Sequence, residues 1–222
     1  MPNYSGIWTL AQQAQAKAAS NWTPVPPTTI GQAFGGGFYA GQIGVSSVAT
    51  HYLIVGPVAS AQSTLTWKNA NTATTGADSL IDGPQNTADM VADGNSTVYP
   101  CAHFCNDAVI GGFTDWYMPS KNELEVCYFN LKPATTVNNT TTGINANAVP
   151  ARASNYTSGT PAQTSVTDFK DTGAEDFAAD NYWSSSEQSA TAAWNQNFNY
   201  ALQKYNDKSD SRKVRAVRRI AV

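Results

Sequence analysis

The sequence predicts an α+β fold with small twisted antiparallel sheets, two or three short helices and long loops. The chain has 222 residues, which suits one sizeable hydrophobic core. Only 13% of the residues are charged, whereas 19 Asn, 24 Thr and 18 Ser supply neutral hydrogen-bonding groups that favour turns. Hydrophobic residues still make up 41%, which excludes intrinsic disorder.

The N-terminal segment differs from the rest of the chain. Residues 9–20 are rich in Ala and Gln and have good helix propensity but a weak apolar stripe, and the prolines after them favour an extended spacer. We expect an arm with a Pro-rich linker over residues 1–29 and one domain over residues 30–222. An arm this small buries little by itself, so its apolar residues are expected to anchor a partner protein: Tyr4, Ile7, Trp8, Leu10 and Trp22.

The first part of the domain contains strand and helix signals in alternation. Residues 51–55 and 65–68 are apolar or β-branched runs bounded by turns, which predicts two strands. An Asp-Gly-Pro turn predicts a helix over residues 82–91, and a second helix is expected over residues 98–106.

The clearest helix begins after Ser120. Glu123 lies three residues later, which completes a capping box, and Pro133 ends the segment. The apolar residues of this helix share one face: Leu124, Cys127, Tyr128 and Leu131. Residues 134–165 then show no periodicity and carry Arg152 as their one charge, so we expect a long functional or mobile loop.

The C-terminal part of the chain predicts β structure. Residues 182–186 and 194–200 are expected to be strands, with Trp194 and Phe198 facing the core. Because side chains alternate between the two faces of a strand, the intervening amides are expected to point outward in a row: Asn195, Asn197 and Asn199. Basic and apolar residues alternate in residues 213–220, which predicts a closing strand with a solvated basic face.

Residues suited to catalysis are few. The chain has two histidines, and Cys101, His103 and Cys105 do not have the spacing of a zinc site. We therefore expect no enzyme activity, no metal and no cofactor. The Gly-rich run at residues 35–37 lacks the ending of a phosphate loop, and the longest apolar run is too short to cross a bilayer. Neither nucleic-acid binding nor membrane insertion is expected.

Four motifs occur in an order that resembles the Lcl C-terminal-domain-like family. They are Gly112 to Glu125 (GFTDWYMPSKNELE), Tyr182 to Glu187 (YWSSSE), Ala193-Trp194 with Asn197-Phe198, and Val214 to Arg218 (VRAVR). The similarity spans about residues 34–220. It implies a C-type-lectin-like fold, with Trp183 and Trp194 in the core. In such folds the C-terminal strands present ligands, and the corresponding positions here are Asn195, Asn197, Asn199, Tyr200, Lys204, Tyr205 and Asn206.

The resemblance also implies a biological setting, because many members of this family are phage virion or bacterial surface proteins. Residues 3–10 also resemble short segments of phage structural and tail-associated proteins. We therefore expect a virion protein that is made in the host cytoplasm. Its arm would bind a phage tail or capsid protein, and its domain would bind a host-surface glycan or protein. A homo-oligomer is expected, with a trimer favoured. The alternatives are a purely structural decoration protein and an enzyme of the formylglycine-generating kind.

Overall fold

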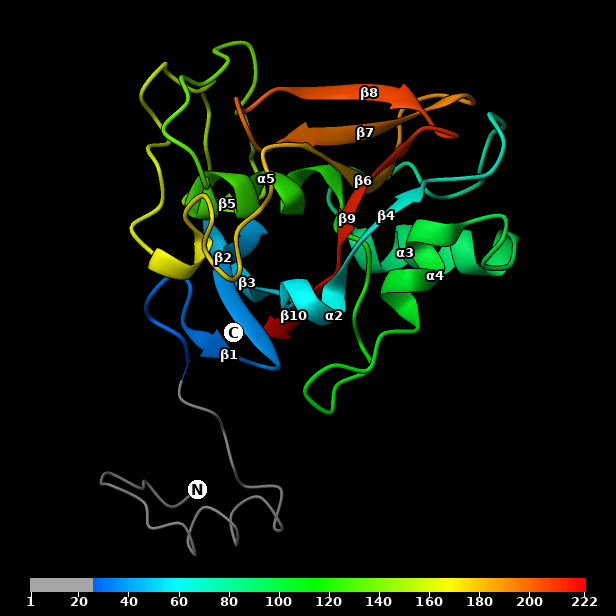
Figure 1. Cartoon of the computed structure of the whole chain (residues 1–222), viewed down its shortest axis with the longest axis horizontal. Helices are drawn as coiled ribbons and strands as arrows, with labels where there is room; N and C mark the ends of the chain where they lie inside the picture. The colour runs from blue at the N-terminus through cyan, green and yellow to red at the C-terminus, as the bar shows by residue number, and fades with distance from the viewer. Residues whose placement is uncertain (1–25) are drawn as a thin grey trace, which may run out of the picture.

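The computed structural model describes residues 26–222, which form two sheets, several short helices and long connections (Figure 1). The expected arm and its anchoring residues up to residue 25 lie outside the described part. The first sheet has the order β1-β2-β3-β10, and β5 also pairs with β2; all of these pairs are antiparallel. Its strands are β1 (Ala33–Phe34), β2 (Gly37–Val45), β3 (Val48–Val55), β5 (Ala148–Val149) and β10 (Val217–Ala221).

The second sheet has the order β4-β9-β6-β7-β8, so β4 and β8 are its edge strands. Its strands are β4 (Gln62–Thr66), β6 (Asn181–Glu187), β7 (Ala192–Asn197), β8 (Gln203–Asp207) and β9 (Ser211–Arg215). The pairing of β6 with β9 is parallel, whereas the sequence predicted antiparallel sheets throughout. The coarser prediction of a mixed α+β fold with few helices is confirmed.

The helices are α2 (Val58–Ala61), α3 (Gly83–Asp93), α4 (Pro100–Asn106), α5 (Lys121–Leu131) and the 3-10 turn η1 (Thr167–Phe169). Helix α5 contacts β2 of the first sheet and both β6 and β7 of the second, so it lies between the sheets (Figure 1). The capping box is confirmed: the Ser120 hydroxyl accepts a hydrogen bond from the Glu123 N–H, and the Glu123 carboxylate accepts one from the Ser120 N–H.

The buried apolar residues form two clusters. One surrounds α5 and includes Tyr182 and Phe198. The other packs α3 and α4 against the second sheet and includes Trp183, which is completely buried as expected. Consecutive residues of β6 therefore point into different clusters, as alternation along a strand requires.

The long segment after α5 contains only the two-residue strand β5, which confirms its predicted irregularity. The Lys132 ammonium holds one end of it. This buried side chain donates to the carbonyl of Thr136 at 2.6 Å, to Oδ1 of Asn138 at 2.7 Å and to the carbonyl of Pro161 at 3.3 Å. The ammonium thus joins two stretches of the loop that are more than twenty residues apart.

Glu125 holds the middle of the same loop. Its carboxylate, on the loop-facing side of α5, is fully buried and pairs with the Arg152 guanidinium. The Tyr156 hydroxyl and Nδ2 of Asn145 donate to the same carboxylate, and the guanidinium lies 4.1 Å from the ring centroid of Phe129. The one charged residue of the loop is therefore an internal anchor.

The predicted closing strand over residues 213–220 is wrong in two respects. The chain passes from β9 in the second sheet to β10 in the first, and Ala216 lies between them. The basic side chains are also not a solvated face. Arg215 is 1% exposed and pairs with Glu175 at 2.9 Å, and Arg218 makes two 2.8 Å hydrogen bonds to the Asp115 carboxylate. These residues tie distant segments together because a guanidinium can donate several hydrogen bonds at once.

Candidate functional site

The outer part of the second sheet carries a group of accessible side chains that we call the aromatic surface, formed by Lys121, Trp194 and Tyr205. Tyr205 is 55% exposed and Trp194 is half-buried. Their ring centroids lie 5.6 Å apart at an interplanar angle of 87°, and Nζ of Lys121 lies 4.2 Å from the Trp194 ring centroid. Both geometries are favourable for aromatic and cation–π contacts.

Local structure explains why these three residues meet. Trp194 on β7 and Tyr205 on β8 are register partners, so their side chains share one face of the antiparallel pair. Lys121 is the first residue of α5, and its backbone is fixed to the same region. Its N–H donates to the Ser186 hydroxyl at 3.0 Å, and its carbonyl accepts from Nε2 of Gln203 at 3.3 Å.

The charge of Lys121 is not neutralised by a contact. None of the ion pairs within residues 26–222 includes it. Burial lowers the pKa of Lys121, and the nearby Glu125 carboxylate opposes that shift. The aromatic surface therefore offers two rings and one ammonium donor, a combination suited to binding a ligand by stacking and hydrogen bonds.

The predicted outward row of asparagines is wrong. Asn195 and Asn197 are 2% and 5% exposed, and the expected core residue Trp194 lies at the surface beside Tyr205. The two amide side chains donate hydrogen bonds to neighbouring strands of the sheet. Nδ2 of Asn195 donates to Asn206 on β8 at 3.0 Å, and Nδ2 of Asn197 donates to Asn181 on β6 at 3.1 Å. β7 is flanked by strands on both sides, so amide side chains are retained as cross-strand pairs.

The other predicted ligand positions remain partly accessible. Asn199 and Tyr200 lie in the turn after β7, where the Thr136 hydroxyl donates to Asn199 Oδ1 at 2.9 Å and the Asn139 N–H donates to the Tyr200 carbonyl at 2.8 Å. Lys204 and Asn206 are half-buried on β8. The strand ends at Asn197 rather than at residue 200, and Phe198 is buried as expected.

Sequence reasoning missed Lys121 as a surface residue next to β7. The capping box identifies it as the first helical residue, but only the packing of α5 against β6 and β7 brings it to Trp194. The sequence wrongly predicts Trp194 in the core because a strand pattern gives two faces and no indication of which one is covered.

The three cysteines are unsuited to nucleophilic chemistry. Cys101, Cys105 and Cys127 are free thiols with no exposed surface, and burial raises the pKa of each. Within residues 26–222, no group of three or more His, Cys, Asp or Glu side chains could hold a metal ion. Burial and the neighbouring Arg219 lower the pKa of His51, which favours the neutral imidazole and makes it a poor proton donor.

The cluster of charged side chains around Glu123 has a structural role. A cavity of about 360 Å³ adjoins Asp82, Asp115 and Arg219. Glu123 lies beside it and accepts hydrogen bonds from Arg219 Nε at 2.7 Å, the Gly83 N–H at 3.2 Å, the Ser120 N–H and the Tyr117 hydroxyl. Each of these three carboxylates is already paired with an arginine, which favours a structural role over acid–base catalysis.

No helix within residues 26–222 has the length and apolar character needed to span a bilayer.

Comparisons with known proteins identify the family. A comparison with curated proteins found no match. Residues 56–218 match the family described as the Lcl C-terminal domain, and this match includes α3, α4, α5 and the whole of the second sheet. The chain therefore belongs to the Lcl C-terminal domain family.

Proposed function

We propose that this chain is a non-enzymatic phage virion protein whose domain binds a host-surface glycan or protein through the aromatic surface. The observation that supports the proposal is the Trp194–Tyr205 pair with Lys121 above the indole. Rigid aromatic rings supply contact area at low conformational-entropy cost, and the ammonium adds hydrogen-bond donors.

A C-type-lectin-like fold is the finer assignment that we propose for the domain. It fits two small sheets, a capped helix between them, and a long irregular segment next to the turn between β7 and β8. Family membership supports it, because the second sheet lies within the matched residues. Ligand contact on C-terminal strands of such a domain would include Lys204, Tyr205 and Asn206 on β8.

The remaining parts of the proposal concern assembly. We propose that residues 1–29 anchor the chain to a phage tail or capsid protein, that the domain assembles as a homo-oligomer, with a trimer favoured, and that the virion is its final location. The support is the aromatic N-terminal sequence and its Pro-rich spacer. Removal of residues 1–22 should abolish incorporation into particles while the domain stays folded.

Binding to host cells tests the recognition role. Labelled full-length protein carrying Tyr205→Ala or Lys121→Gln should bind the bacterium that the phage infects at least about tenfold more weakly, which corresponds to the loss of one good contact. Phe113→Ala is the matched control, because Phe113 is another accessible aromatic, and its ring packs against Arg218 away from the aromatic surface. Equal binding of the Tyr205→Ala protein and this control would favour a decoration protein that has no external ligand.

A further inference from the structure

We infer that the outer edge of β4 binds an extended peptide from another protein, which adds one more strand to the second sheet. β4 is an edge strand, and its inner side pairs with β9 in a continuous antiparallel register. In such a pair, successive residues direct their N–H and C=O groups alternately to the inner and to the outer side. The inference goes beyond the proposed function and does not depend on it.

The outward main-chain groups of β4 are unpaired. The Ala216 N–H donates to the Ala61 carbonyl at 2.8 Å, so the backbone of Ala61 faces β9. By alternation, the N–H and C=O groups of Gln62, Thr64 and Thr66 face outward. Within residues 26–222, no hydrogen bond includes the main-chain groups of these three residues. Thr64 is exposed and the other two are half-buried, so a second chain can reach this edge.

β4 also lacks the features that usually protect the edge of a sheet. Natural edge strands carry charged residues, prolines or bulges, which prevent pairing with another chain. The opposite edge strand, β8, contains Lys204 and Asp207. β4 has the uncharged sequence QSTLT, and its pairing with β9 has no register shift. β4 is therefore the edge of the second sheet that is better suited to pair with another strand.

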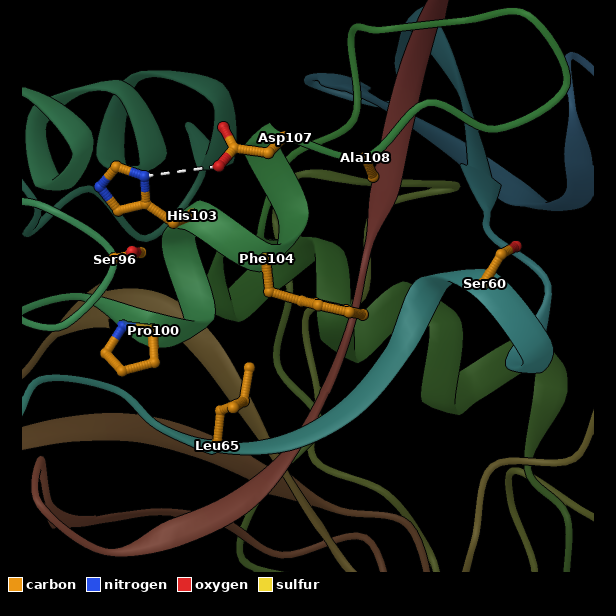
Figure 2. A pocket seen from close by; sticks show the side chains of 8 residues that line it. All are labelled: Ser60, Leu65, Ser96, Pro100, His103, Phe104, Asp107 and Ala108. Carbon is orange, nitrogen blue, oxygen red and sulfur yellow. Dashed lines mark ion pairs between the residues drawn. The ribbon is translucent and has the colours of Figure 1, made fainter.

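A groove beside this edge can receive side chains of the added strand. It lies between β4 and α4 and has a volume of about 430 Å³. Figure 2 shows Leu65 of β4 pointing towards α4, where Pro100 and Phe104 lie across from it. These three side chains are half-buried, so part of their apolar surface is open. Because side chains alternate along a strand, every second residue of the peptide would face the groove, and an apolar residue fits there.

The other face of the added strand would meet a positive charge. Lys213 on β9 is the register partner of Thr64, so both side chains lie on the face opposite to Leu65. None of the ion pairs in the described part of the chain includes Lys213. Strands are about 4.8 Å apart, so a glutamate placed opposite Thr64 would lie roughly 10 Å from the Lys213 backbone, within the combined reach of two long side chains. The edge therefore selects a peptide in which apolar and acidic residues alternate.

Two other occupants fit this edge less well. The N-terminal arm over residues 1–29 contains no acidic residue, so it offers no partner for Lys213. Two copies of the chain paired through β4 would place both Lys213 side chains on one face of the joined sheet with no acidic residue between them. An acidic, alternating peptide from a different protein satisfies both the main-chain groups and the charge.

Hydrogen exchange measured by NMR on the full-length protein tests this pairing. The probe is the peptide Ac-TLELELT-amide, which has the same side-chain order in either direction, with leucines on one face of an extended chain and glutamates on the other. Saturating peptide should slow exchange at least about tenfold at the outward amides of Gln62, Thr64 and Thr66. The amides of Ser63 and Leu65 already face β9 and should change little.

Variants separate main-chain pairing from side-chain contacts. Thr64→Pro removes one outward donor and leaves the ladder to β9 intact, so it should weaken binding of the peptide at least about tenfold. Thr64→Ala is the matched control, because it keeps the N–H, and its affinity should stay within about twofold of the wild type. The wild type should bind Ac-TLELELT-amide at least about threefold more tightly than Ac-TLKLKLT-amide, and Lys213→Gln should abolish that preference.

Several results would overturn the inference. They are the absence of saturable binding of Ac-TLELELT-amide, protection at other amides in place of the three outward ones, and equal affinity of the folded Thr64→Pro and Thr64→Ala proteins. If Thr64→Pro does not fold, the exchange pattern and Lys213→Gln decide. A dimer in light scattering that Thr64→Ala retains and Thr64→Pro loses would assign the edge to a second copy instead. Tyr205→Ala should leave peptide binding unchanged, which separates this edge from the aromatic surface.

Discussion

Replacing Arg152 with methionine isolates the energy with which the long loop is held to α5. Methionine keeps an apolar stem over the Phe129 ring but removes the cation from Glu125, which is fully buried. Tyr156 and Asn145 would still donate to the carboxylate, so its hydrogen bonds are reduced rather than lost. A buried carboxylate without its cation is strongly unfavourable.

The structure sets the size of the effect. Removing one partner of a buried ion pair costs about 3–5 kcal/mol, and the Arg152 side chain is 15% exposed, so we expect a loss near 3 kcal/mol. For a chain of this length, 1 kcal/mol corresponds to roughly 2–4 °C, so the melting temperature should fall by about 6–12 °C. Hydrogen exchange should also accelerate first in residues 140–157.

Calorimetry and urea unfolding of three variants measure this. Arg212→Met is the control, because its partner Asp210 is 44% exposed and such pairs contribute about 1 kcal/mol or less. Glu125→Gln combined with Arg152→Met should be more stable than Arg152→Met alone, since no unpaired charge remains. The reasoning is refuted if Arg152→Met is no less stable than the control, or if the double variant gains nothing.

Three further predictions concern buried polar groups. Burial lowers the pKa of Lys132, so between that lowered value and about 10.4 the unfolded chain binds a proton that the folded chain lacks. The free energy of unfolding, relative to that of Lys132→Met, should therefore rise with pH in this range. Urea unfolding at several pH values measures this. Asn195→Ala should lower the free energy of unfolding by about 1–3 kcal/mol, because Asn206 loses its hydrogen-bond donor. Asn199→Ala should lower it by less than about 0.5 kcal/mol, because Asn199 is partly accessible. Similar melting temperatures for the two variants would contradict the buried placement of Asn195. A thiol reagent should modify none of the three cysteines, Cys101, Cys105 and Cys127, in the native protein and all of them after denaturation. Rapid labelling of the native protein would contradict their burial.

The sequence predicts elements well where a local rule defines them. The capped helix begins at Lys121 and ends before Pro133, because the capping box and the proline act within a few residues. The helices expected over residues 82–91 and 98–106 correspond to α3 and α4, with boundaries that differ by two residues or fewer. The strand expected over residues 65–68 lies slightly earlier, as β4.

Features that depend on tertiary contacts were not predictable. Alternation in residues 194–200 defines two faces, but only what packs on each face in the folded domain decides that Asn195 is enclosed and Trp194 is accessible. Likewise, alternating basic residues indicate a strand but do not reveal that Arg215 meets Glu175, forty residues away. The aromatic surface therefore required the structure, although Tyr205 was already a candidate.

The crossing at Ala216 has a consequence for how the molecule can come into being. β9 is an internal strand of one sheet and β10 closes the other, so eleven consecutive residues complete both. Neither sheet has all its strands until this stretch is in place, so we expect the two sheets to be completed together and late in synthesis. We therefore expect a substitution in residues 211–221 to change the stability of both sheets together.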